Sequence, residues 1–490
     1  MTPLKQLASQ TAIYGLSSIL GRFINYLLVP LYTYLFRPEE YGVVSEFYAY
    51  AGFFAVILVC GMETGYFRFR SESAENCDST SLFCVLAVNS IFLLALYLGL
   101  KPLAQALRYP DHTEYLIYFG WILAFDASAA IPFAKLRAEN RALRFASIKL
   151  IEILLAVALN LYLIVYCRHA FDTAPDSFSA RLYDPEIGIG YIFIANLAAC
   201  ALKVLLLLPQ FKGLKAGINF ALLAKLLRYS LPMVVIGLAG VANETFDRAM
   251  MKYLLPYDLE TNLKLLGIYS ACYKLSILMS LFIQAFRYAG EPFFFAQSQS
   301  RESAKLYADV MRYFVIFCAF VFLLVTLFMD LFQYFVGESF RVGLKVVPIL
   351  LLANLFLGIY VNLSIWYKLT DHTALGALVS LIGAGITLGL NIWWIPIFGY
   401  IGSAWATLIC YFVMCALSYG LSRIYYPIRY NVAAVFGYIA FALLIYFENS
   451  RLIQLSGWHP LATATLNITG FLAITILLER RRRVMLGSKA

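Results

Sequence analysis

The chain has 490 residues, of which 62% are hydrophobic and only 13% are charged. A soluble globular protein is nearer half apolar and a quarter charged, so this composition excludes a water-soluble chain with an ordinary polar surface. The formal net charge is +10. Because the basic residues gather between apolar runs, we interpret this excess as a determinant of membrane topology and lipid contact, and we expect no nucleic-acid partner.

Fourteen apolar runs follow one another along the chain. A bilayer core about 30 Å thick requires roughly 20 apolar residues per helix. The predicted spans are 11–36, 42–66, 82–100, 115–134, 147–166, 188–208, 229–251, 265–289, 311–329, 344–367, 374–394, 400–421, 431–447 and 460–478. The runs are too long for barrel strands, and backbone polar groups facing lipid must be satisfied within a helix. The sequence therefore predicts an all-α integral membrane protein with about 14 transmembrane helices.

The lysines and arginines of the loops predict the orientation. If the N-terminus is cytoplasmic, the basic loop after the fourth span and the basic C-terminal tail both lie inside, as the positive-inside rule requires. We therefore expect both termini in the cytoplasm. The longest loop on the other side, 167–187, is too short for a soluble catalytic domain, so we expect no enzyme.

The cysteines and histidines give no sign of a metal centre. Nine cysteines are scattered without a CxxC pattern or a Cys/His cluster, and the chain has four histidines. Most of the thiols fall in apolar runs, where cysteine behaves as a small hydrophobe. We expect no metal, no disulfide framework and no cofactor.

An internal repeat relates the two halves of the chain. The fifth and eleventh predicted spans both begin after a polar turn with an Ala-Leu pair and end at an asparagine, Asn160 and Asn391. Spans one to six thus pair with spans seven to twelve, and because six is even the copies share their orientation. This predicts six-helix lobes at 1–210 and 211–425 around a central cleft, with two extra helices and a basic tail at 426–490.

Two segments carry a family resemblance. TAIYGLSSILGRFINYLLVPLYTYLFRPEEYGVVSEF (11–47) and LGLNIWWIPIFGYIGSAWATLI (388–409) resemble the polysaccharide-transporter branch of the MOP exporter superfamily, which contains the Wzx-like O-antigen and capsule-unit flippases. The resemblance implies a flippase of the bacterial inner membrane that serves the synthesis of lipopolysaccharide or other surface polysaccharides. Its expected substrate is an undecaprenyl-pyrophosphate oligosaccharide, moved from the cytoplasmic to the periplasmic leaflet by alternating access.

The number of predicted spans indicates a second resemblance, to another kind of lipid flippase. Fourteen spans also resemble the lipid II flippase, in which the last two helices accommodate the lipid tail. This leaves the carried glycolipid open. The expected partners are the lipid-linked oligosaccharide, membrane lipids, and glycan polymerase or assembly proteins.

Charged residues within predicted spans are costly at membrane depth and usually mark a pathway. A pyrophosphate requires fixed cationic donors, and the planar fork of arginine matches its oxygens. The candidates for this headgroup site are Arg22, Asn25, Arg248, Lys274 and Arg287. Alternatively, Arg248 neutralises a nearby carboxylate and Arg287 reaches the interface with its long side chain.

Carboxylates within the spans are candidates for coupling transport to a proton or sodium gradient, because such a group can bind a cation in one conformation and release it in another. The candidates are Asp247, Glu244, Asp126 and Glu63. Alternatively, each is a structural ion-pair partner. Glu152 and Lys203 complete the set of charges within the spans.

Three other functions remain open. A cation-coupled multidrug exporter of the same superfamily would have an acidic, aromatic cleft without free arginines, and Arg22 argues against it. A membrane-embedded glycosyl transferase or polymerase would use carboxylates or histidine near the bilayer surface, as in the 167–187 loop. A scaffold for an assembly complex would transport nothing.

Overall fold

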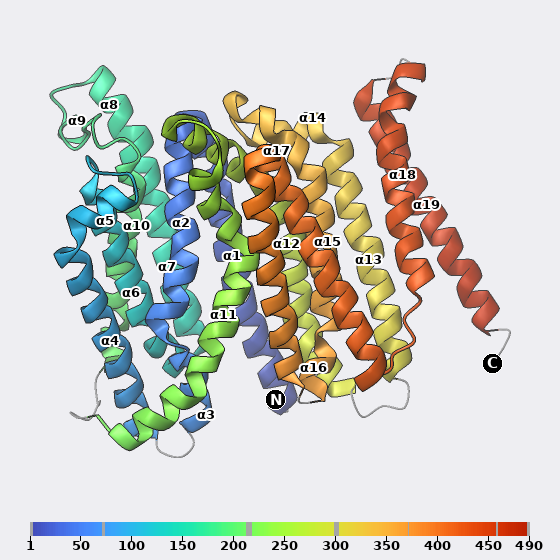
Figure 1. Cartoon of the computed structure of the whole chain (residues 1–490), viewed down its shortest axis with the longest axis horizontal. Helices are drawn as coiled ribbons and strands as arrows, with labels where there is room; N and C mark the ends of the chain where they lie inside the picture. Colours follow the sequence, from blue (N-terminus) through green and yellow to red (C-terminus); the bar gives the residue numbers. More distant parts are fainter. Residues whose placement is uncertain are drawn as a thin grey trace. The chain divides into compact units, whose positions relative to one another are not determined.

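The computed structural model describes residues 3–70, 74–211, 218–297, 303–370, 372–456 and 459–487. These residues form helices joined by short linkers, and no strand occurs among them (Figure 1). The all-α prediction is confirmed.

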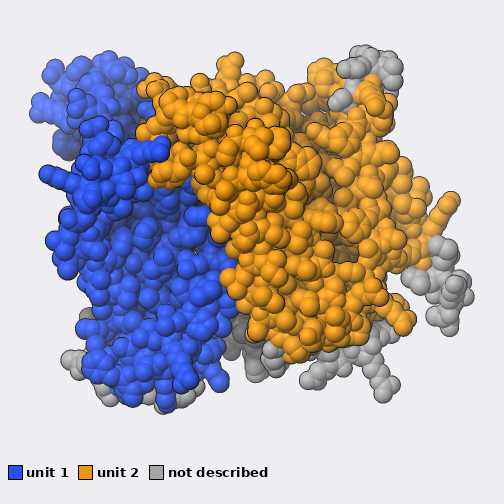
Figure 2. All heavy atoms as spheres, viewed as in Figure 1, with its two compact units in different colours: residues 1–28, 40–249 blue, residues 29–39, 250–490 orange. Residues whose placement is uncertain are grey.

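The chain divides into two compact units, coloured blue and orange in Figure 2. Unit 1 comprises Met1–Leu28 and Glu40–Ala249, and unit 2 comprises Val29–Glu39 and Met250–Ala490. The long first helix, α1 (Pro3–Leu35), therefore contributes to both units, and its Pro30 lies beside the boundary. The predicted lobes at 1–210 and 211–425, and the separate pair at 426–490, stay a prediction.

Unit 1 is a bundle in which α10 packs against α6 and α7, and α4 packs against α6. Its helices are α2 (Pro38–Val59), α3 (Met62–Phe69), α4 (Ala74–Leu98), α5 (Leu100–Ala106), α6 (Thr113–Ala138), α7 (Ala142–Asn160), α10 (Gly190–Leu207) and α11 (Phe220–Leu254), of which the last turn, from Met250, belongs to unit 2. The predicted loop 167–187 is partly helical, because a π-helix (Leu161–Cys167) continues α7 into α8 (Arg168–Thr173), and α9 (Phe178–Arg181) follows. A 3-10 turn, Leu208–Phe211, extends α10.

Unit 2 is centred on α15, which packs against α12, α13 and α17. Its helices are α12 (Leu259–Gln297), α13 (Ser303–Leu327), α14 (Met329–Phe332), α15 (Val347–Leu363), α16 (Ile365–Leu369), α17 (Thr373–Tyr425), α18 (Val432–Ser456) and α19 (Pro460–Gly487). Two 3-10 segments, Gln333–Phe335 and Glu338–Val346, join α14 to α15. Buried Arg312 of α13 lies 2.9 Å from Asp309 and 3.1 Å from Glu479, which ties α19 to α13.

The described residues hold twelve helices that are long and apolar enough to cross a membrane, and a shorter apolar segment at Ile19–Leu35. One of the twelve, α17, has 53 residues. A continuous helix of that length would measure roughly 80 Å at about 1.5 Å per residue, more than twice a bilayer core of about 30 Å. Helix α17 breaks at Gly399, whose φ of 61° and ψ of −148° lie in a region that favours glycine. Counting α17 as two spans and the α1 segment as one accounts for the fourteen predicted spans.

The two asparagine landmarks of the repeat have the same local geometry. Asn160 and Asn391 are both fully buried. Each Nδ2 donates a 2.7 Å hydrogen bond to the carbonyl four residues earlier, that of Ala156 or Thr387. Both precede a departure from regular helix, the π-helix after α7 and the Gly399 break in α17. This shared geometry supports a true repeat.

Candidate functional site

Three charged side chains meet inside unit 1, and we call them the charge triad: Asp126 of α6, Glu152 of α7 and Lys203 of α10. The Lys203 ammonium donates to Glu152 Oε1 at 2.5 Å and to Asp126 Oδ1. Asp126 lies at the middle of α6, within an apolar span. Charges at this depth are costly to desolvate, and their mutual contact offsets much of that cost.

Two further groups adjoin the triad. Cys200 lies one turn before Lys203, with its Sγ 3.3 Å from Asp126 Oδ1. The Lys149 ammonium lies 3.4 Å from Glu152 Oε2, on the side away from Lys203. The triad alone has one excess negative charge, and Lys149 balances it.

The three members differ in exposure. The side chain of Lys203 is 2% exposed and that of Glu152 is 13% exposed, whereas that of Asp126 is 48% exposed. Ligand atoms of Asp126, Glu152 and Cys200 lie within 4.8 Å of one another, a spacing that could hold a cation. Because the Lys203 ammonium already touches both carboxylates, an added metal cation would face a like charge. Asp126 is the most exposed member of the triad.

The triad is not required by the repeat. Glu152 precedes the Asn160 landmark by eight residues, and the residue eight before Asn391 is Gly383. The carbonyl of Gly383 accepts a hydrogen bond from the Cys410 thiol at 3.4 Å. The position that holds a carboxylate in the first copy therefore holds glycine in the second.

The predicted headgroup residues fall in both units. Arg22 and Asn25 are exposed on the part of α1 that belongs to unit 1, where Gly21 packs closely against Ile153 of α7. Arg22 forms no ion pair with any residue that the structure describes. Arg248 of α11 is also in unit 1, whereas the remaining two candidates, half-buried Lys274 and exposed Arg287 of α12, are in unit 2.

The other three coupling candidates lie outside the triad. Asp247 of α11 is buried, and its Oδ1 accepts a 2.8 Å hydrogen bond from the Arg248 backbone N–H. Glu244 is exposed one turn earlier and has no ion pair within the described ranges. Glu63 of α3 forms an ion pair with Arg137 near the end of α6. The structure thus joins Asp126 to a second carboxylate and a buried ammonium.

Sequence reasoning identified the members of the triad but did not connect them. A usable signal was present, since the fourth and sixth predicted spans each contain a single charged residue, Asp126 and Lys203, of opposite sign. Charges isolated in neighbouring spans require partners, and the nearest opposite charge belongs to the adjacent helix.

The fold is that of the MOP exporter superfamily. One similar solved structure, "Lipid II flippase MurJ, inward closed conformation", has a TM-score of 0.68 at 15% identity, covering 94% of this chain and 98% of that chain. Inward-facing and outward-facing structures of a multidrug resistance MATE family transporter each have a TM-score of 0.59 at 14% identity. The first alignment covers 84% of this chain and 94% of that one, and the second covers 86% and 98%.

The profile of the polysaccharide biosynthesis protein family matches residues 7–296. The match spans more than half of the chain, so the chain belongs to this family. No functionally curated protein matches it. The resemblance to the polysaccharide-transporter branch is confirmed, and the chain is a multi-pass membrane protein.

Proposed function

We propose that this protein flips an undecaprenyl-pyrophosphate oligosaccharide from the cytoplasmic to the periplasmic leaflet of a bacterial inner membrane, for the synthesis of a surface polysaccharide such as O-antigen. The observation that carries the proposal is membership of the polysaccharide biosynthesis family on an exporter fold. Both termini are cytoplasmic in this proposal, and glycan polymerase or assembly proteins receive the product.

Arg22 is the first residue that we assign to the pyrophosphate. Its guanidinium is exposed on an otherwise apolar stretch of α1 and has no ion pair among the described residues. A planar fork of N–H donors suits phosphate oxygens better than a point charge does. Asn25, Arg248, Lys274 and Arg287 remain candidates for the same headgroup.

The charge triad couples flipping to a proton gradient in this proposal. A proton that binds Asp126 neutralises one of the two carboxylates that contact the Lys203 ammonium. The Asp126–Lys203 ion pair then weakens, while the Glu152–Lys203 pair remains. Two conformations that differ in this contact differ in proton affinity, which is the requirement for coupling. A sodium ion is the alternative coupling ion.

The test uses the full chain in liposomes with a fluorescent undecaprenyl-pyrophosphate oligosaccharide, and it measures leaflet exchange under proton or sodium gradients. Wild type is expected to exchange the lipid, and Arg22→Ala is expected to abolish exchange. Arg22→Lys should retain part of the rate, since it retains the charge but loses the fork. Arg451→Ala is the matched control, because Arg451 is an exposed residue of α18 whose i,i+3 ion pair contributes little. Exchange by Arg22→Ala at the wild-type rate would refute the headgroup assignment.

The coupling role is tested separately with Asp126→Asn. This variant is expected to exchange lipid at a rate that no longer responds to a proton gradient. The control Glu448→Gln removes the exposed carboxylate that pairs with Arg451, and it should respond as wild type does. If wild-type exchange responds to a sodium gradient but not to a proton gradient, sodium is the coupling ion.

One alternative substrate has a specific observation in its favour. The similarity to the lipid II flippase structure covers 94% of the chain, more than either MATE alignment. Lipid II is therefore the second substrate in the same assay, and a multidrug cation is the third. Exchange of lipid II alone would reassign the substrate, and export of the drug alone would indicate a multidrug exporter. Activity with none of the three would favour the transferase, polymerase or scaffold alternatives.

A further inference from the structure

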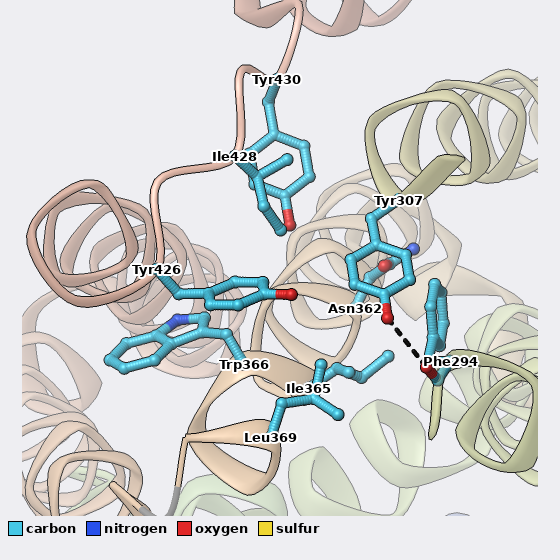
Figure 3. A pocket seen from close by; sticks show the side chains of 9 residues that line it. All are labelled: Phe294, Tyr307, Asn362, Ile365, Trp366, Leu369, Tyr426, Ile428 and Tyr430. Atoms are coloured by element: carbon cyan, nitrogen blue, oxygen red, sulfur yellow. Dashed lines mark hydrogen bonds between the residues drawn. The ribbon is translucent and has the colours of Figure 1, made fainter. Parts of the chain in front are cut away.

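The two ends of unit 2 differ in their charged groups. The aromatic pocket shown in Figure 3 lies between the end of α12 and the linker that follows α17, which is the cytoplasmic end if the N-terminus is inside. Its volume of ≈ 10 Å³ gives room for about one water molecule, and no charged side chain among the described residues lines it. The opposite, outer end of unit 2 contains Arg341, which forms no ion pair with any residue that the structure describes. The outer end therefore offers a positive charge that the cytoplasmic pocket lacks.

Arg341 lies on a segment that is fixed against the end of α1. This segment is the 3-10 helix Glu338–Val346, and the residue before it is Gly337. The Gly337 N–H donates to Thr33 Oγ1 at 3.1 Å, and a Cβ added at Gly337 would overlap the Thr33 carbonyl oxygen. Because the two chain segments fit so closely, the arginine is held in place before any ligand arrives, which lowers the entropic cost of binding.

Two exposed tyrosines hold the guanidinium of Arg341. It lies over the Tyr334 ring, 4.8 Å from the centroid, in a cation–π contact. Its Nη2 donates to the Tyr34 hydroxyl at 3.4 Å, and that hydroxyl donates to the Tyr334 carbonyl at 3.0 Å. A guanidinium has five N–H donors, and this is the only one with an acceptor among the described residues, since the buried Nε has none. The side chain therefore keeps donors for a ligand that carries several oxygens.

Neither the neighbouring carboxylates nor the membrane topology accounts for Arg341. Glu338 lies three residues earlier on the same segment and Asp330 lies on α14, and both are exposed without an ion pair to any described residue. With the N-terminus inside, the segment is periplasmic, and the positive-inside rule disfavours basic residues on that side. The arginine is thus available to an external anion.

The position of the site along the helices indicates which anion it meets. Tyr34 is the next-to-last residue of α1, and the Arg341 segment directly precedes α15, so both lie where the spans reach the outer surface. Tyrosine is enriched at the level of the lipid headgroups, and the side chains of Tyr34 and Tyr334 are more than half exposed. The anions at that level are lipid phosphates, and the planar fork of arginine matches two phosphate oxygens.

We propose that Arg341, Tyr34 and Tyr334 form a binding site for the phosphate group of a lipid in the outer leaflet. The guanidinium donates to the phosphate oxygens, while the Tyr334 ring and the Tyr34 hydroxyl hold its plane. Two lipids supply this chemistry, the flipped pyrophosphate lipid and a resident anionic phospholipid. The outer location rests on the proposed function, which sets the orientation, and all three residues belong to unit 2.

The binding test uses the full chain in detergent and native mass spectrometry, which counts bound lipid molecules. The probes are undecaprenyl pyrophosphate, dioctanoyl phosphatidylglycerol, and dioctanoylglycerol, which has no phosphate. All variants carry Arg22→Ala, so that the headgroup site assigned to Arg22 does not contribute. Arg341→Gln is expected to weaken binding of a phosphate lipid about tenfold and to leave binding of dioctanoylglycerol unchanged. Arg341→Lys retains the charge but loses the fork, and it should weaken binding about threefold.

Matched variants supply the controls. Lys264→Gln removes an exposed cation at the start of α12, also on the outer side, that has no cation–π contact with any described residue, so it should bind lipid as the background does. Tyr334→Phe keeps the ring beneath the guanidinium and should bind normally, whereas Tyr334→Leu removes the ring and should weaken binding about threefold. The tyrosine pair keeps the test decisive if Arg341→Gln folds poorly.

The probes distinguish the two sources of phosphate. An effect of Arg341→Gln on undecaprenyl pyrophosphate alone assigns the site to the flipped lipid, an effect on phosphatidylglycerol alone assigns it to a resident phospholipid, and an effect on both assigns it to lipid phosphates in general. Unchanged binding of both lipids, or an equal loss with Lys264→Gln, would overturn the inference. Because lipid exchange is measured separately, exchange without Arg341-dependent binding refutes this site alone, and Arg341-dependent binding without exchange refutes the proposed function alone.

Discussion

Replacing Lys203 with methionine is expected to destabilise unit 1 strongly. The substitution retains most of the apolar stem but removes the ammonium that contacts Asp126 and Glu152. Removing one partner from a buried ion pair costs about 3–5 kcal/mol, because the remaining charge is left desolvated.

The structure places the expected cost at the lower end of this range. Asp126 is half exposed and can be solvated, and Glu152 retains Lys149 at 3.4 Å. We therefore expect a loss of about 3 kcal/mol in the free energy of unfolding, which corresponds to roughly a hundredfold change in the unfolding equilibrium constant.

The measurement is the free energy of unfolding in lipid bicelles, read from the binding of a bulky partner that traps the unfolded state. Lys264→Met is the control, since Lys264 is an exposed residue of α12 and its loss should change stability by less than about 0.5 kcal/mol.

The neutral triple variant Asp126→Asn, Glu152→Gln, Lys203→Met is the decisive comparison. Replacing a whole buried ion cluster is often neutral, so this variant should recover to within about 1 kcal/mol of wild type and yet lose gradient-driven exchange.

Two results would refute the reasoning. If Lys203→Met unfolds as wild type does, the contacts of the Lys203 ammonium carry no energy. If the triple variant is as unstable as the single one, the loss comes from packing around the side chain and not from an unbalanced charge. Recovery of both stability and gradient response in the triple variant would confine the triad to a structural role.

Three further substitutions test the fold in the same unfolding measurement. Arg312→Met leaves the Asp309 and Glu479 carboxylates without their cation and should cost about 3 kcal/mol; Arg312→Lys should recover part of the loss, and full stability of the methionine variant would contradict the proposed tie between α13 and α19. Gly337→Ala should cost about 1–3 kcal/mol, because its Cβ would collide with the backbone of α1. Gly399→Ala should cost a similar amount, about 1–3 kcal/mol, owing to its left-handed φ of 61°. Gly420→Ala is the control for both, since nothing lies within 4 Å of its added Cβ and alanine favours a helix by about 1 kcal/mol; an equal loss there would contradict both explanations.

Hydropathy alone was sufficient to predict the helices. A span must be apolar over its whole length, so the signal lies in consecutive residues and requires no knowledge of tertiary contacts. The predicted separation between the eleventh and twelfth spans, for example, coincides with the break at Gly399. The asparagine landmarks of the repeat were visible for the same reason, because each bonds within its own helix.

Tertiary structure decided which polar residues act together. Lys203 and Asp126 are 77 residues apart, and Arg341 and Tyr34 are 307 residues apart. No periodicity links such residues, because their contact depends on which helix faces pack together. The composition of this protein determined that it spans a membrane, and the charged residues within its apolar spans marked the candidate site residues. Packing alone decided that three of these charges, from three different helices, meet in one triad.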